Sequence, residues 1–236
     1  PLAQTVADAC LLDDALLGRS PVLRTSPGRA AGRLVIPSGI VTSEIEPGVA
    51  AAFEQAAEHL ARQGFTVERR AVPVLDLTHY LFATFGTLVG IEAVEVHRKL
   101  LDSPELTRVD ARIVQRLRLG QAIPAQNRQA LRDNRQRLIA AMAAALAPDE
   151  ALLFPTVPMA APPIAALEAD PAWFAQCNAR VLRNTMIGSY LDMPTLALPC
   201  GTDGAGLPVG MSLAMATGRD EALLALGLAV ECGLAS

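Results

Sequence analysis

The chain has 236 residues, of which 51% are hydrophobic and 4% aromatic, and its formal net charge is −4. This length and apolar content allow a sizeable core, in one large domain or two small ones. The acidic balance gives no electrostatic basis for binding nucleic acid or an anionic membrane, and no stretch reaches the ~18 apolar residues of a membrane span, so we expect neither partner.

The cysteines indicate the cellular compartment of the protein rather than a disulfide framework or a metal site. Cys10, Cys177, Cys200 and Cys232 lie far apart, without a C-x-x-C pair or a His at metal-ligand spacing. This pattern predicts buried thiols in a reducing, cytoplasmic environment rather than a disulfide framework, and we expect neither a metal nor a cofactor. The chain begins with Pro1 and shows no secretory signal, which predicts a processed or truncated product.

The first third of the chain predicts alternating helices and strands. Thr5 is a favourable N-cap for the first helix, and Pro47 stands at the first helical position of the second. Apolar residues recur with a helical period in both helices, whereas alternation marks a strand. The predicted ranges are 6–17 (helix), 33–37 (strand), 46–63 (helix) and 65–72 (strand).

The middle of the chain is predicted to be helical, and the last third returns to strands. The expected helices cover 77–101, 107–119 and 125–146, with breaks at Ser103-Pro104 and at Gly120 to Pro124. The expected later elements are strands at 152–154, 195–198 and 209–213 and a closing helix at 220–234. The connection 157–170 is long for a compact domain, and such loops are usually functional or disordered.

This order of elements defines an expected fold class. Interleaved strands and helices predict an α/β protein with a mixed, largely parallel sheet flanked by helices. Residues 77–146 form a helical insertion between the second and third strands. No internal repeat is visible, and we treat residues 1–236 as part of a single domain.

Four stretches resemble, in order, the later part of the amidase-signature hydrolases. They are Pro1 to Ala9, Glu92-Ala93 with His97, Leu153 to Pro158 with Ala161-Pro162-Pro163, and the run from Met193 to Gly210 with its Leu-Pro strand, turn and Gly-Leu-Pro-x-Gly strand. The order and spacing carry the resemblance, which spans nearly the whole chain. It implies the C-terminal part of the family's α/β/α fold, in an amidase or a relative of the amidotransferase A-subunit.

The same resemblance implies that the catalytic part is absent from these residues. The family uses a Ser–Ser–Lys triad, in which a shielded lysine serves as the base for a serine nucleophile and a Gly/Ser-rich loop supplies oxyanion donors. These groups precede the segment matched by Pro1 to Ala9. The chain has no Gly-Gly-Ser-Ser-Gly-Gly run, and its one lysine, Lys99, lies outside the family's base position on a predicted solvated helix face. We therefore expect no catalytic residue here, and a chain inactive by itself.

Five residues are candidates for a substrate pocket. Thr156 and Pro158 stand at the end of a predicted strand, where open α/β sheets bind ligands, although prolines there can also simply end the strand. Arg183, Asn184 and Thr185 belong to a polar cluster that could orient a polar or carboxylate substrate, or instead cap a helix and link segments. We weigh these two roles equally.

Two further positions relate to the amidotransferase branch. Arg116 lies where that branch places a carboxylate-binding arginine, although a solvated surface arginine is the simpler interpretation. An Asp that holds the substrate amine in that branch corresponds to a place near Leu182 and Arg183, which argues against recognition of glutamine.

The leading hypothesis is therefore the C-terminal portion of an amidase-signature hydrolase that cleaves a carboxamide C–N bond in a small molecule. One alternative is a non-catalytic binding or scaffold chain of the same architecture, and another is an amidotransferase A-like subunit. The apolar surplus predicts a partner, either the missing N-terminal half or a second copy that meets an exposed apolar surface.

Overall fold

The computed structural model describes residues 2–25 and 32–235. Their strands form a five-stranded sheet with the order β2-β1-β3-β5-β4. The strands are β1 (Arg33–Ser38), β2 (Thr66–Ala71), β3 (Glu150–Pro155), β4 (Thr195–Thr202) and β5 (Pro208–Ala214). β1 pairs in parallel with β2 and β3, whereas β5 pairs antiparallel with β3 and β4. The predicted mixed α/β sheet is confirmed, and parallel and antiparallel pairings share it equally among the described residues.

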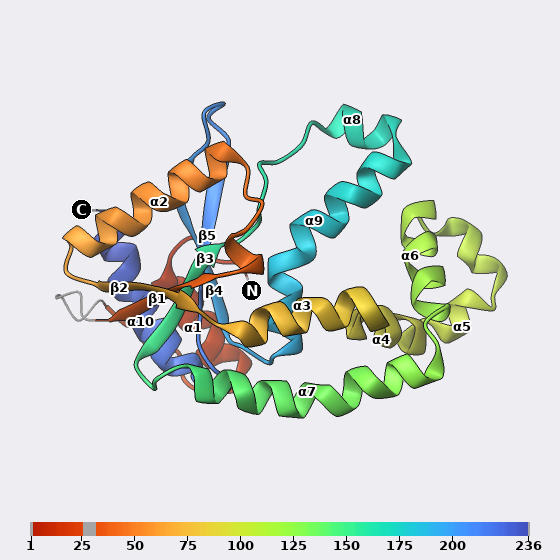
Figure 1. Cartoon of the computed structure of the whole chain (residues 1–236), viewed down its shortest axis with the longest axis horizontal. Helices are drawn as coiled ribbons and strands as arrows, with labels where there is room; N and C mark the ends of the chain where they lie inside the picture. The colour runs from red at the N-terminus through yellow and green to blue at the C-terminus, as the bar shows by residue number, and fades with distance from the viewer. Residues whose placement is uncertain (1, 26–31, 236) are drawn as a thin grey trace.

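Helices cover both faces of the sheet (Figure 1). One face carries α1 (Val6–Leu16), α2 (Pro47–Arg62) and α10 (Asp220–Leu234). The other carries the short helix η1 (Ile40–Thr42) and the longer α3 (Pro73–Phe85), α7 (Ala125–Ala145) and α9 (Pro171–Tyr190). The remaining helices are α4 (Leu88–Val96), α5 (Arg98–Leu101), η2 (Pro104–Arg108), α6 (Ala111–Gln121) and α8 (Ile164–Ala169).

The central strand β3 divides the core into two apolar clusters. All six of its residues are buried, and successive side chains point to opposite faces. Ala151 and Leu153 pack with α1, α2 and α10, whereas Leu152 and Phe154 pack with α3, α7 and α9. A strand buried on both faces reads as a continuous apolar run, which is the pattern that singled out Leu152 to Phe154 in the sequence.

Local signals account for several helix ends. The Thr5 side chain accepts a hydrogen bond of 3.1 Å from the Asp8 N–H, which confirms the predicted N-cap of α1. Pro47 is the first residue of α2, as expected. The predicted helix 77–101 is wrong as one element, because Gly86 ends α3 with φ of +90° and Thr87 caps a new helix, α4. The long connection 157–170 contains a short helix, α8.

The helical insertion reaches away from the sheet. Figure 1 shows α4, α5 and α6 at the end of the molecule farthest from the strands, beyond α3 and α7. No single helix in residues 2–25 and 32–235 combines the length and hydrophobicity needed to cross a membrane. Only α3 and α4 taken together pass by length and composition, and they are bent by 52°.

Candidate functional site

The carboxyl ends of β1 and β3 meet at one edge of the sheet, because the two strands run parallel. β3 continues into Thr156 and Pro158, and β1 continues through a turn into η1. The Thr156 hydroxyl lies 2.9 Å from that of Ser212 on β5, and the Thr156 N–H donates to the Gly210 carbonyl at 2.9 Å. Pro158 is buried, and its carbonyl accepts from the Glu46 N–H at 2.9 Å.

Asn184 on α9 ties these two strand ends together. Its amide nitrogen donates to the Pro155 carbonyl at 2.8 Å and to the Val41 carbonyl at 3.0 Å, and its side chain is buried. Its amide oxygen accepts from Arg183 Nε at 3.1 Å. Both donors and the oxygen of this amide are thus engaged with the protein.

Arg183 is also buried, and it extends the same linkage. Besides Asn184, it donates to the Ser43 carbonyl at 2.8 Å. Loss of hydration lowers the pKa of Arg183 below the usual arginine value, with Glu44 acting in the opposite direction. Thr185, in contrast, is exposed and donates to the Leu182 carbonyl within its own helix at 3.3 Å. The structure thus places Thr156, Arg183 and Asn184 together at the carboxyl ends of β1 and β3. Thr185 lies outside this group.

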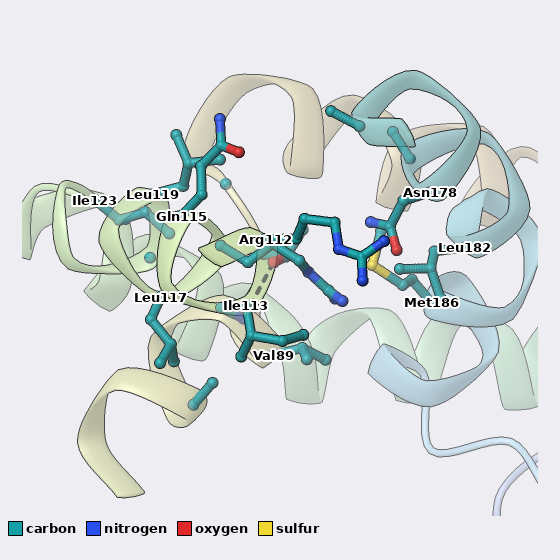
Figure 2. Close-up of a pocket in the computed structure, with 18 of the residues that line it drawn as sticks. Val89, Arg112, Ile113, Gln115, Leu117, Leu119, Ile123, Asn178, Leu182 and Met186 are labelled. Atoms are coloured by element: carbon teal, nitrogen blue, oxygen red, sulfur yellow. Dashed lines mark hydrogen bonds between the residues drawn. The ribbon is translucent and has the colours of Figure 1, made fainter. Parts of the chain in front are cut away.

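A pocket of about 540 Å³ lies elsewhere, between α4, α6 and α9. Figure 2 shows Val89, Ile113 and Leu119 on one side and Asn178, Leu182 and Met186 on the other, with Arg112 between the two. The volume is that of a small-molecule site, and the apolar lining with a few polar groups fits such a site. None of the five residues predicted from the sequence lines it.

The polar residues of this pocket are neutral or basic. They are Thr87, His97, Arg112, Gln115, Arg116 and Asn178. The Arg112 side chain donates two hydrogen bonds to the Asp110 carboxylate, of 3.0 and 2.7 Å. The Arg112 guanidinium also lies 4.7 Å from the centre of the Phe174 ring. Hydrogen bonds from the Arg112 side chain and backbone N–H lower the pKa of Asp110 to about 2. The side chains of Arg116 and Asn178 make no hydrogen bond or ion pair within the described part of the chain.

The sequence did not predict this pocket, because its walls come from residues far apart in the chain. It marked only separate positions of the lining, such as Arg116 and Leu182. The available signal was compositional: an insertion whose helices carry apolar residues on more than one face, such as Ile113, Leu117 and Leu119 on α6. Leu117 packs against Val94 and Leu101, whereas Ile113 and Leu119 stay largely exposed where they line the pocket.

Lys99 is exposed on α5, in keeping with the expected surface lysine. No group of three or more His, Cys, Asp or Glu side chains in residues 2–25 and 32–235 is arranged to hold a metal ion. The described residues thus combine a layered α/β framework with an apolar pocket of ligand size.

Comparison with known proteins identifies the family. The family described as Amidase matches residues 1–224. The 2-amino-5-chloromuconic acid deaminase of Comamonas testosteroni is 30% identical over 233 residues, which are 98% of this chain and 50% of that protein. The A-subunit of the glutamyl-tRNA(Gln) amidotransferase from Salinispora tropica is 26% identical, with 98% and 54% covered. A crystal structure of an amidase superposes with a TM-score of 0.78 at 25% identity, covering 98% of this chain and 51% of that one.

The chain belongs to the amidase family, and the resemblance noted in its motifs is confirmed. It spans about half the length of the curated relatives it matches.

Proposed function

We propose that this chain supplies the substrate-binding portion of an amidase that hydrolyses the C–N bond of a small-molecule carboxamide. The observation that carries the proposal is the apolar pocket between α4, α6 and α9. It has the size and lining of a ligand site, and it belongs to a chain of the amidase family. The Ser–Ser–Lys triad is then contributed by residues outside these 236.

The pocket favours an amide with an apolar body. Leu182, in the region where the amidotransferase branch carries an acidic residue, lines the wall next to Met186. An amine would lose hydration there without gaining a charged partner, which disfavours glutamine as the substrate. An amidotransferase A-like subunit is the second candidate, because Arg116 also lines the pocket and no described residue occupies its guanidinium. A non-catalytic binding chain is the third, and it would use the same cavity.

Exposed apolar side chains support a partner for this chain. Leu16, Leu17 and Leu23 near the end of α1 are 74%, 61% and 68% exposed. We propose that this surface meets either the catalytic half of the protein or a second copy, and that the assembly works in the cytoplasm. Size-exclusion chromatography of the chain at several concentrations tests whether the chain pairs with a second copy of itself.

Binding and turnover, measured separately, test the proposed function. Calorimetric titration of the intact chain with phenylacetamide should show saturable binding, and no ammonia should be released. Filling the pocket with Leu182→Trp should abolish binding, whereas Leu16→Trp on exposed α1 should not. Glutamine should bind more weakly than phenylacetamide.

Each result decides between the candidates. Turnover by the chain alone, verified by intact mass, would refute the proposed division of labour. Binding that survives Leu182→Trp would remove the pocket from the site. Tighter binding of glutamine than of phenylacetamide would favour the amidotransferase-like alternative.

A further inference from the structure

Residues 87–121 project from the layer of helices that covers the sheet, and the two chain segments that flank them lie side by side. Gly86 precedes this segment and Ile123 follows it. A Cβ placed on Gly86 would lie 2.7 Å from Ile123 Cδ1, so the Ile123 side chain on the outgoing chain packs directly against the Gly86 backbone. Gly86 has φ of +90°, a conformation that a side chain disfavours, and α3 and α4 are bent by 52° across it. This geometry is that of a hinge with two adjacent backbone crossings.

The segment between these crossings has a core of its own. Val94, Leu101 and Leu117 form a buried cluster separate from the two that flank the sheet, with Ala93 and Leu106 packed against it. We call residues 87–121 the α4–α6 lobe. Its helices are in backbone contact, because a Cβ on Gly120 would lie 2.3 Å from the Gly90 carbonyl oxygen. Ile91, near the start of α4, is instead fully buried in the cluster shared by α3, α7 and α9. The lobe is therefore anchored at its base and packs separately beyond it, which lets the rest move as a unit.

The lobe is attached to α7 along one side. Arg132 on α7 pairs with Glu95 on α4 at 2.6 Å, and Arg128 donates to the Gln121 and Ile123 carbonyls at 2.9 and 2.8 Å. The Arg128 bonds lie at the crossing, whereas the Arg132–Glu95 pair holds the end of α4. They hold the base of the lobe and leave its far end, around η2 and the start of α6, free of them.

Across the pocket, a cation–π contact links the lobe to α9. The Arg112 guanidinium stacks 4.7 Å from the centre of the Phe174 ring, and Asp110 holds it in that orientation. Within the described ranges, no hydrogen bond or ion pair joins α6 to α9. The close-up places Arg112 between the α6 and α9 walls of the cavity (Figure 2). This pair therefore spans the pocket opposite the hinge.

We propose that the α4–α6 lobe is a lid over the pocket, that it turns about Gly86 and Ile123, and that the Arg112–Phe174 pair is the clasp that keeps it closed. An apolar amide enters when the clasp opens and is enclosed when it re-forms. The identity of the ligand rests on the proposed function, whereas the hinge and clasp do not. A guanidinium on an aromatic face contributes modestly, so the lid opens readily and the clasp sets how often.

Hydrogen exchange of the whole chain, without ligand, tests the lid. Arg112→Gln should speed amide exchange across residues 88–121 about two- to five-fold, which corresponds to the usual strength of one such contact. Exchange in the buried part of α7 should not change. Arg118→Gln is the matched control, since Arg118 is on the same helix and bonds only to Gln121. Equal exchange in the two variants would overturn the lid, and so would a uniform rise throughout the molecule.

A double variant separates the clasp from a general loss of packing. Phe174→Leu should loosen the lobe as Arg112→Gln does, and the combined variant should add nothing further. The chain's one tryptophan, Trp173, neighbours Phe174. Acrylamide quenching of its fluorescence should rise to the same level in all three variants. Additive effects of the two substitutions would refute the clasp.

Phenylacetamide then separates the lid from the proposed function. Protection of the lobe at saturating ligand supports both. Binding that leaves exchange in the lobe unchanged would refute the lid as the gate of the pocket. Failure to bind, together with the loosening by Arg112→Gln, would leave the lid standing and refute the proposed function instead.

Discussion

At the residue scale, Asn184 links three segments with one buried amide. It donates to the carbonyls of Val41 after β1 and of Pro155 at the end of β3. Removing the amide leaves two buried carbonyls without a donor. An unsatisfied buried carbonyl destabilises the fold more than the removal of both partners of a hydrogen bond would. We expect Asn184→Ala to lower the free energy of unfolding by about 2 kcal/mol and Tm by about 4–8 °C, measured by calorimetry.

Asn178 provides the control for this prediction. It lies on the same helix, is half-buried, and its side chain makes no hydrogen bond within the described ranges. Asn178→Ala should change the free energy of unfolding by less than about 0.5 kcal/mol. Equal destabilisation by the two substitutions would contradict the bridging role and point to a helix-wide effect. If Asn184→Ala instead leaves Tm unchanged and weakens ligand binding, Asn184 belongs to a substrate site, the other role considered from the sequence.

Burial also controls the chemistry of Cys200 on β4. Loss of hydration raises the pKa of this thiol to about 11. At pH 8 the thiolate is then roughly one part in a thousand, and the thiolate is the reactive form. We expect alkylation of Cys200 by iodoacetamide, followed by peptide mass spectrometry, to be slow at pH 8 and to accelerate about tenfold per pH unit up to pH 10. Labelling as fast as that of free glutathione at pH 8 would show that the thiol is not desolvated.

At the element scale, α4 and α6 depend on a pair of glycines. A Cβ on Gly120 would come 2.3 Å from the Gly90 carbonyl oxygen, and backbone cannot yield as a flexible side chain can. Gly120→Ala should therefore separate the two helices and destabilise the lobe by about 1–3 kcal/mol, as overpacking does. Exchange should rise in residues 88–121 and stay constant in α10. Gly204→Ala, where a new Cβ meets nothing within 4 Å, is the control, and a similar response there would contradict the packing argument.

The same elements show how far the sequence predicts this fold. Strand β3 was recognised because a strand buried on both faces is continuously apolar, and α10 was placed to the residue because acidic Asp220 begins it. The helix expected over 77–101 is broken because Gly86 adopts positive φ and Thr87 caps the next helix. A Gly-Thr pair is a recognisable stop and start, but the apolar run around it favours one continuous helix.

The candidate site was less predictable, and the reason is physical. Thr156, Arg183 and Asn184 were found through motif order and polarity, and the structure does bring them to one strand edge. The cavity depends on α6 facing α9, a long-range arrangement set by the hinge at Gly86 and Ile123. No local pattern encodes such a contact, so Phe174 and Arg112 gave no sign of their pairing.

At the scale of the whole molecule, one buried carboxylate joins three strands at the edge opposite the carboxyl ends of β1 and β3. Glu150 begins β3, and it lies 2.9 Å from Arg33 on β1 and 2.6 Å from Arg70 on β2. It also accepts from the Ala147 N–H at 2.9 Å. This backbone bond, followed by the two arginines, lowers the pKa of Glu150 in the folded state, although burial alone would raise it.

A depressed carboxyl pKa makes stability depend on pH with a definite sign. The unfolded chain binds a proton to Glu150 near pH 4.5, whereas the folded chain does so only at lower pH. The contribution to stability is therefore complete above pH 4.5 and is lost as the pH falls through the lower folded-state pKa. We expect the urea midpoint to be level between pH 7 and pH 5 and to fall below about pH 4.5, with Asp110 adding to the loss.

Glu150→Gln isolates this contribution, because the amide fits the same space but carries no charge to balance Arg33 and Arg70. We expect a loss of about 1–3 kcal/mol at pH 7 and a shallower fall of the urea midpoint between pH 4.5 and pH 2. The control is Glu105→Gln, because the partner of Glu105, Arg108, has a side chain that is 80% exposed. This variant should leave the stability at pH 7 and the acid dependence of the urea midpoint nearly unchanged. A variant as stable as the parent at pH 7 and equally sensitive to acid would mean that the strands are held by apolar packing alone, with the ion pairs contributing nothing measurable.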